Sequence, residues 1–597
     1  MGTAVKQFWL AYLDLGCALL AAALWYLSST IGPWPLLIAL IPWGVRLLGR
    51  RPLVLTPYAL PLLLFVVTAG LSLWAAYDPA AAWPKFWRII GALLLFYATA
   101  HGLRAGLRPA VYGWLLAAMG VALSLYFGWT NDWTARPGYF PALAALGQWG
   151  QAWLPPPAAA HRLNPNVAGG MLAFALPFTL MTLFSPAPAR RWLALALSGS
   201  ALLVTAGGLL ASSSRGAWLA LLAAAGLAGL WLLLGLVAPA PARRRWLFLA
   251  TVTAGVALLI FLFSRPAAGP WLLQLGWDPV RLAVLQDSLL LAQDYPFIGA
   301  GLDGFMMLHV SYAMLLHVGY IVHSHNLFLN VAIEQGGVAL LLLISLWLIF
   351  GQQLWQQAGA GGGHRWLAAA ALALVTLLAH GLVDDVFYGS RALLLLFLPL
   401  AFTVRPATVR LAGQAPDAPL TAGRRRWLGL GAVLFLVLLL AGWQQQTLRA
   451  RWYANLAAVA QSRAELAVYR WPDWPLQDAV RRELDLTTPL ANYRRALALD
   501  PQLVSAHRRQ GQILLSLGDY EAAWGHLAAA YAAQPWANAT RQLYGEALIV
   551  NGQVAEGAAL WATVLNQQNQ LAARAFWYQH IGDGQRAQWI REALPGR

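Results

Sequence analysis

Cysteine is almost absent from this chain, with Cys17 alone among 597 residues. A disulfide within the chain is therefore impossible, and a metal site built on cysteine is disfavoured. Charged residues are also scarce, at 11% of the chain against about a quarter in an ordinary soluble domain. Hydrophobic residues make up 59% of the chain, and many of them form runs near the roughly 20 residues that cross a bilayer. The composition therefore indicates a polytopic membrane protein.

We predict thirteen membrane spans from the apolar runs. No small-residue cleavage site follows the first run, and its apolar core is long, so we interpret it as an uncleaved span rather than a signal peptide. The spans are expected near residues 8–29, 34–48, 57–76, 84–102, 109–128, 166–185, 192–210, 216–238, 246–263, 326–350, 366–381, 390–404 and 427–443.

Basic residues are unevenly divided between the two sides of these spans. Of the 25 Lys and Arg before residue 444, 17 fall in the loops of one side and eight in those of the other. Positively charged loops stay in the cytosol, so we place the N-terminus and the 17 charges inside. This pattern accounts for much of the net charge of +17 and argues against a nucleic-acid face. The outer residues are Lys85, Arg88, Arg136, Arg162, Arg215, Arg265, Arg281 and Arg391, with Asp78, Asp132, Asp278, Asp287, Asp294, Asp303, Asp384 and Asp385.

Two predicted outer loops, residues 129–165 and 264–325, are long enough to be functional. The second contains RLAVLQDSLLLAQDY ahead of Pro296, which predicts a helix lying on the outer membrane surface. GAGLDG at 299–304 fits a dinucleotide-binding pattern, but no βαβ unit accompanies it, so its glycines are interpreted as a tight turn near substrate or membrane. The apolar positions of the predicted helix are Leu282, Leu285, Leu289 and Ala292.

From residue 446 onward the chain is polar and repetitive. A 34-residue period, together with the phrases ALALDP and LGDYEAA, predicts tetratricopeptide-like helical repeats over residues 446–597, and a generic helical bundle is the alternative. The thirteenth span would place this domain outside. The pairs that define the period are Pro501 and Pro535, Gly511 and Gly545, and Gly518 and Gly552.

Three outer arginines stand in distinctive settings: Arg162 in HRLNPNVAGG, Arg215 in ASSSRGAWLALL and Arg281 in WDPVRLAVLQDS. Each alone is also typical of an interfacial arginine that reaches lipid headgroups. Guanidinium groups bind phosphate oxygens bidentately and stay charged. Several of them converging at a membrane surface would suit a lipid-linked pyrophosphate.

The stretch IVHSHNLFLNVAIEQGG places His323, His325 and Asn326 at the edge of an apolar run. An extended segment would point both imidazoles to one side; alternatively, a helix begins by His325. Imidazoles exchange protons near neutral pH, so His325 is a candidate base for a sugar hydroxyl. The alternatives are a helix-capping histidine, or a zinc site that adds His309 and His317. No carboxylate or cysteine at a recognisable spacing completes such a site.

Several of these segments, in this order and spacing, resemble the O-antigen ligase/polymerase superfamily. They are SSSRGAWLALLAA, RLAVLQDSLLLAQDYPFIGAGLDGF and HSHNLFLNVAIEQGGVALLLL, together with RLNPNVAGGMLAFALP and LSLWAAYDPAAAWPKFWRIIGALLLFY. The resemblance covers about residues 50–404. It implies an all-α fold, with a GT-C-like polytopic bundle in residues 1–445 and the helical repeat domain after it.

The resemblance implies a metal-independent, inverting glycosyltransferase without a cofactor, which moves a glycan from undecaprenyl pyrophosphate to an acceptor on the external face of the cytoplasmic membrane. His325 would be the catalytic base, with His323 and Asn326 in support. Arg215 and Arg281, and less directly Arg162, would bind the pyrophosphate. The implied partners are the lipid-linked donor, a glycan, lipid or protein acceptor, membrane lipid and a protein partner for the repeats, but no nucleic acid. Ligase and polymerase remain alternatives.

A flippase or solute transporter is the alternative from another functional class. Such a protein is expected to show duplicated halves and charges deep within its spans. The membrane part shows no internal repeat, and the carboxylate of Asp14 has no basic partner in its own span. A membrane-tethered scaffold would leave the outer arginines and histidines without a role. The enzyme hypothesis requires Arg215, Arg281 and His325 to converge on one outward-facing cavity.

Overall fold

The computed structural model describes most of the chain as a set of packed helices, and no β-strand occurs among the residues it describes. The fold class is therefore all-α, as predicted. The description covers residues 3–27, 32–49, 56–158, 161–185, 191–238, 240–263, 274, 278–316, 320–357, 364–404, 444–469, 475–565 and 569–595. The predicted thirteenth span, 427–443, lies outside these residues.

Eleven long helices coincide with the first eleven predicted spans. Five of them, α4, α5, α8, α9 and α14, are long and apolar enough to cross a membrane on length and composition, which supports a membrane protein. The helices are α1 (Thr3–Leu27), α2 (Leu36–Leu48), α3 (Ala59–Ala75), α4 (Pro79–Arg104), α5 (Pro109–Thr130), α7 (Pro165–Thr182), α8 (Arg191–Ala211), α9 (Arg215–Val237), α10 (Pro241–Phe263), α14 (Leu327–Gln357) and α15 (His364–Gly381).

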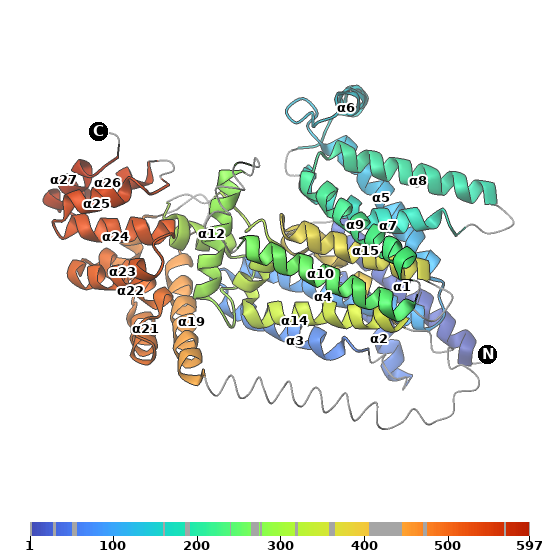
Figure 1. Ribbon diagram of the computed structural model, residues 1–597, viewed down its shortest axis with the longest axis horizontal. Coiled ribbons are helices and arrows are strands. Elements are labelled where there is room, and N and C mark those ends of the chain that lie inside the picture. The colour runs from blue at the N-terminus through green and yellow to red at the C-terminus, as the bar shows by residue number, and fades with distance from the viewer. Residues whose placement is uncertain are drawn as a thin grey trace.

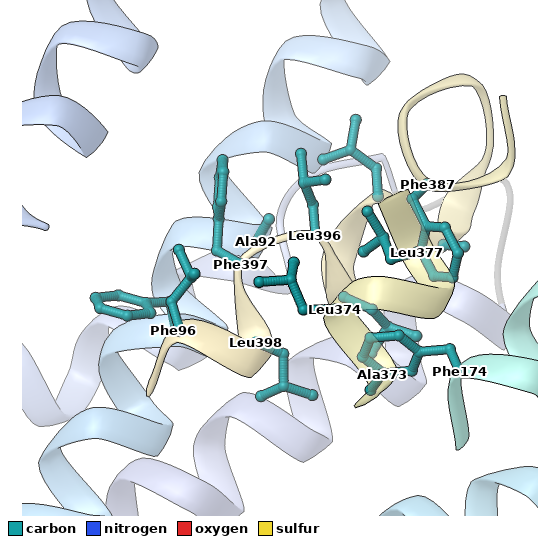
Figure 2. Close-up of a cluster of buried hydrophobic side chains, with 14 of the residues drawn as sticks. Ala92, Phe96, Phe174, Ala373, Leu374, Leu377, Phe387, Leu396, Phe397 and Leu398 are labelled. Carbon is teal, nitrogen blue, oxygen red and sulfur yellow. The ribbon is translucent and has the colours of Figure 1, made fainter. Parts of the chain in front are cut away.

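The twelfth predicted span, 390–404, is not one continuous helix. The chain here forms α16 (Val386–Gly389), the 3-10 helix η4 (Arg391–Leu395) and α17 (Leu398–Ala401). Ser390 between the first two has an extended backbone. Because these pieces are enclosed by other helices, their broken backbone is not exposed to lipid. Figure 2 shows Leu396, Phe397 and Leu398 packed beside Ala92 and Phe96 of α4, and Phe387 beside Phe174 of α7 and the α15 residues Ala373, Leu374 and Leu377.

The loops assigned to the two sides of the membrane lie at two ends of the helical bundle, and which end faces the cytosol stays a prediction. At one end Arg365, the second residue of α15, donates to the carbonyl of Phe184 after α7. The guanidinium of Arg245 near the start of α10 lies 5.6 Å from the ring centre of Trp355 near the end of α14. The starts of α9, α12 and α14 gather at the opposite end, where the outer loops are predicted.

Asp14 in α1 is not a lone intramembrane carboxylate. It forms an ion pair with Arg46 of α2, and both side chains are buried. The partner lies 32 residues away, in the neighbouring predicted span. A buried charge that is paired in this way is explained by helix packing, so it gives no support to the transporter alternative.

The long loops contain helices of their own. The first holds α6 (Pro141–Trp153), and the second holds α12 (Pro279–Asp294), α13 (Phe305–His309) and the π-helix η3 (Val310–Met314). Helix α12 confirms that a helix precedes Pro296, while its position on the outer membrane surface stays a prediction. Its fully buried face differs from the apolar positions named in the sequence. Val284, Ser288 and Leu291 are buried, whereas Leu289 is 45% exposed. The reason is that α12 packs against η3, α14 and two C-terminal helices, α19 (Gln445–Leu466) and α22 (Val504–Leu517) (Figure 1).

The C-terminal region is a stack of shorter helices at one end of the elongated molecule (Figure 1). Gly511 and Gly545 each lie where a side chain would meet the following helix, at Leu527 and Trp561, and Gly518 and Gly552 both have a φ of +91°. The 34-residue period thus relates equivalent structural positions. The helices are α19 (Gln445–Leu466), α20 (Gln477–Glu483), α21 (Thr487–Leu499), α22 (Val504–Leu517), α23 (Tyr520–Ala533), α24 (Asn538–Val550), α25 (Val554–Trp561), α26 (Gln570–His580) and α27 (Gly584–Glu592).

Candidate functional site

The tight turn at 382–385, between α15 and α16, organises the candidate site. The backbone N–H groups of Val383 and Asp384 donate to the carbonyl of His380, over 3.0 and 2.9 Å. These bonds close the end of α15 and leave the carbonyls of Leu382 and Val383 pointing to other elements. The turn is thereby a fixed point on which side chains from several helices meet.

Two predicted site residues bind this turn from the starts of their helices. Arg281, in the first turn of α12, donates from Nη1 to the carbonyl of Val383 over 3.3 Å. Asn326 donates from Nδ2 to the carbonyl of Leu382 over 3.0 Å. The Oδ1 atom of Asn326 also accepts the backbone N–H of Leu329 at 3.0 Å, so Asn326 is the N-cap of α14.

Arg215 is the first residue of α9 and lies beside the same turn. Ser214 caps the helix by accepting the backbone N–H of Ala217, and Ser213 before it has a φ of +54°. A side chain at the next position, Gly216, would come within 2.9 Å of the Val383 side chain. The beginnings of α9, α12 and α14 therefore converge, and each helix start carries partial positive charge.

His325 points its imidazole at a carboxylate of the turn. Its Nδ1 lies 3.2 Å from Oδ1 of Asp384, and its side chain is 31% exposed. The residue has a φ of +52°, a left-handed conformation that is uncommon for histidine and places the ring beside that of His323, with ring centres 4.4 Å apart. Helix α14 begins two residues later, at Leu327, so His325 precedes the helix rather than opening it.

Protonation states follow from these contacts. Burial opposes ionisation of Asp384, but the hydrogen bond from His325 and the nearby histidines outweigh it and hold the carboxyl pKa at about 2. An ionised carboxylate can only accept, so the Nδ1 atom of His325 carries the proton in this hydrogen bond. Burial and the charge of His325 lower the pKa of His323 to about 4, so this ring is neutral at physiological pH.

The same three side chains form a group that could surround a metal ion. The ligand atoms of His323, His325 and Asp384 lie within 4.8 Å of one another. No carboxylate stands at a recognisable spacing in the sequence, but folding brings Asp384 to the two histidines from 59 residues away. His309 lies apart, paired with a carboxylate of α12, and His317 is outside the described residues. The Nδ1 atom of His323 already accepts the backbone N–H of His325 at 3.3 Å, so a metal would have to displace that bond.

Arg162 has a partner of its own in the first outer loop. Its Nη1 lies 2.7 Å from Oδ2 of Asp132, and its Nε donates to the carbonyl of Pro157 over 3.4 Å. The hydrogen bonds and ion pairs of the described residues do not bring Arg162 to the 382–385 turn. Of the three predicted pyrophosphate ligands, Arg281 contacts the turn directly, and Arg215 adjoins Gly216, which packs against Val383 of the turn.

A buried polar layer behind the turn was not predicted. Asp385 accepts a hydrogen bond from Asn330 of α14, whose Nδ2 also lies 3.5 Å from Oε1 of Glu334. Glu334 forms an ion pair with Lys85 of α4 at 2.8 Å, and Lys85 is only 1% exposed, with its Nζ 4.0 Å from the ring centre of Tyr388. The sequence signal that could have indicated this layer is the adjacent pair of acids in GLVDDVFYG, because the chain has only 23 acidic residues in all.

Comparison with known proteins agrees with the resemblance seen in the motifs. Residues 200–344 match the family model described as O-Antigen ligase, a stretch that includes Arg215, Arg281 and His325 but is well under half of the chain. The match supports the O-antigen ligase superfamily and glycosyl transfer of the ligase or polymerase kind in a membrane. No curated protein and no solved structure matches the chain.

Proposed function

We propose that this protein transfers a glycan from undecaprenyl pyrophosphate to an acceptor hydroxyl on the external face of the cytoplasmic membrane, in the manner of an O-antigen ligase. One observation carries the proposal: the His325–Asp384 pair, Arg281 and the start of α9 with Arg215 meet at a single turn. A basic nitrogen and fixed positive charges are the groups that such a transfer requires.

Arg215 and Arg281 bind the pyrophosphate of the donor in this mechanism. Breaking the bond between the anomeric carbon and the pyrophosphate oxygen develops negative charge on the leaving group. Guanidinium groups and helix starts that are already in place stabilise that charge without reorganising in the transition state. Arg162 remains a predicted third ligand, and it would first have to leave Asp132.

His325 acts as the general base. Its Nε2 takes the proton of the acceptor hydroxyl while the hydroxyl oxygen forms a bond to the anomeric carbon, and the bond to pyrophosphate breaks on the opposite face. The anomeric configuration is inverted, and undecaprenyl pyrophosphate leaves. Asp384 holds the ring and stabilises the imidazolium that forms, while His323 and Asn326 shape the loop. This scheme uses only side chains of the chain, so we propose that the reaction is metal-independent and needs no cofactor.

The acceptor is a glycan, lipid or protein hydroxyl, and polymerisation of repeat units on the same donor is the second candidate reaction. The C-terminal helices, which we assign to the tetratricopeptide-like class from their 34-residue period, lie on the external side with the outer loop. A protein partner for these helices stays a prediction.

The test is glycan transfer in cells that lack the native gene. His325→Ala is expected to lower transfer by about 10²–10⁴-fold, the usual contribution of a general base. Arg215→Ala and Arg281→Ala should each abolish detectable transfer, while Arg495→Ala, an exposed arginine on α21 of the C-terminal helices, should not. Wild-type transfer by His325→Ala or Arg215→Ala protein, present at normal level in the membrane, would refute the assignment.

A further inference from the structure

A buried ion pair joins the outer loop to the C-terminal helices. Both carboxylate oxygens of Asp294, at the end of α12, lie 2.7 Å from Nη2 of Arg508 in α22. The Nη1 atom of Arg508 donates to the carbonyl of Tyr312 over 2.7 Å. Arg508 is 0% exposed and Asp294 1%. The guanidinium therefore fixes two points of the loop at once, in a place that water does not reach.

A second arginine and a carboxylate hold the same loop at Tyr312. The Arg509 guanidinium lies 3.3 Å from the centre of the Tyr312 ring, a cation–π contact, and it donates to the hydroxyl of Tyr295 over 3.3 Å. The hydroxyl of Tyr312 donates to Glu465 of α19 over 3.0 Å. Both faces and the tip of this tyrosine are thus engaged or buried.

The outer loop, at residues 311–316, lies along the inner face of the C-terminal stack. This face is formed by the first helix of each successive helix pair. Ser311 accepts from Gln477 at its hydroxyl, over 2.7 Å, and from Gln512 at its carbonyl, over 2.9 Å. Leu315 and Leu316 form one wall of a cavity of about 200 Å³ whose other walls come from α20, α22, α24 and α26. The concave face that stacked helix pairs offer to a ligand is therefore largely covered by the chain's own outer loop.

The same helices also hold the backbone nearer the site. Oδ1 of Asn455 in α19 accepts the N–H groups of Phe297 and Ile298, at 2.9 and 3.2 Å. The chain then runs against a kink in α14, where the N–H groups of Ala300 and Gly301 donate to the carbonyls of Ile333 and Glu334. One turn earlier in α14, Asn330 binds Asp385, which adjoins Asp384.

We propose that the C-terminal helical domain acts in cis as a clamp on the catalytic loop, with Arg508 and Asn455 as positioning residues. The proposal rests on the proposed function at one point, which is that the loop is called catalytic. In this proposal, buried contacts from α19 and α22 fix residues 294–316. The kink in α14 transmits this constraint to Asp385 and to the turn at 382–385. A protein recruited to the concave face would have to displace the loop.

The clamp is tested by hydrogen exchange of the full-length protein in detergent. Arg508→Met is expected to raise backbone exchange in residues 294–316 and 320–326 at least tenfold, because protection there depends on the buried contacts. The matched control is Arg586→Met, which removes an arginine paired with Asp583 on α27, away from the loop. Asn455→Leu is the second variant, and it leaves no buried charge unpaired. If the Arg508→Met protein does not accumulate, hydrogen exchange of the Asn455→Leu protein tests the clamp.

Transfer assays separate the clamp from the chemistry. For Arg508→Met or Asn455→Leu we expect kcat to fall at least tenfold with the KM for the donor little changed, and Arg586→Met should behave as wild type. Unchanged exchange in the loop, or raised exchange with unchanged kcat, would overturn the clamp. Full transfer by His325→Ala would instead overturn the proposed function while leaving the exchange result intact.

Discussion

At the scale of single residues, Asp384 determines which nitrogen of His325 serves as the base in the proposed mechanism. Its carboxylate, with a pKa lowered to about 2, is ionised at neutral pH, and it accepts the Nδ1 proton of the imidazole. The proposed mechanism assigns the base to the other ring nitrogen, and the side chain is 31% exposed. A positive charge that forms on the ring during proton transfer would lie next to this carboxylate and be stabilised by it.

Asp384→Asn is expected to reduce glycan transfer about 10²-fold or more while leaving the amount of protein in the membrane unchanged. The amide carries no charge to stabilise an imidazolium, and its NH₂ group favours the wrong tautomer of His325. The measurement is transfer in membrane vesicles with the lipid-linked donor. Asp287→Asn is the control, since it removes a carboxylate that also faces a histidine, His309 at 3.1 Å, away from the turn. Equal losses in the two variants would contradict a specific role for Asp384.

At the scale of secondary structure, the apolar runs predicted the helices well because a membrane helix is defined by its own sequence. Prediction was weaker where neighbours decide the structure. The run at 390–404 is apolar enough for a span, yet it breaks into short pieces because it is enclosed by α4 and α15. In α12 the stripe around Leu289 is more apolar than the face at Ser288, but the partner helices, not apolarity, determine which residues are buried.

The GAGLDG segment shows what its glycines permit. Gly299 and Gly301 have positive φ angles, which confirms the predicted tight turn. The turn lies against the backbone of α14 and of Ala76, so it approaches the helical bundle rather than substrate or membrane. Gly336 in α14 has a φ of +87° and faces the carbonyl of Phe297. These glycines allow two backbones to touch where any side chain would separate them.

Gly336→Ala is expected to destabilise the protein by at least about 1–3 kcal/mol, the usual penalty for a strained backbone position. The added methyl would also meet the carbonyl of Phe297, which adds to that penalty. Gly351→Ala is the matched control in the same helix, because no atom lies within 4 Å of the added carbon. Thermal unfolding of the purified proteins in detergent measures both. A Gly336→Ala protein as stable as the control would show that the α14 kink is not held by this contact.

At the scale of the whole molecule, the site depends on pairings that no local pattern contains. His325 stood out because of its own short motif, but Asp384 is 59 residues away and becomes its partner only because α15 ends where α14 begins. Arg508 and Arg509 resemble solvated positions on a polar repeat helix, and both are 0% exposed beneath the outer loop. Sequence therefore predicted the presence of two helical regions, but not that they are joined by a charged interface.

The proposed topology places the C-terminal helices and the outer loop on the same side of the membrane. Because Cys17 is the one native thiol, single cysteines can be introduced into a Cys17→Ala background. Gln588→Cys, exposed on α27, should react in intact cells with a thiol reagent that does not cross the cytoplasmic membrane, and Arg104→Cys, exposed at the opposite end, should react only after lysis. The reverse pattern would invert the assignment of the two faces.

The ion pair between Asp294 and Arg508 spans 214 residues of sequence. At about 5–20 residues per second, the ribosome reaches Arg508 roughly 10–40 s after it has made Asp294. During that interval the nascent loop has crossed the membrane without the helices that will cover it. In the proposed clamp, a chain that ends before α22 lacks the contacts that fix residues 294–316, so we expect such truncated translation products to be inactive in glycan transfer.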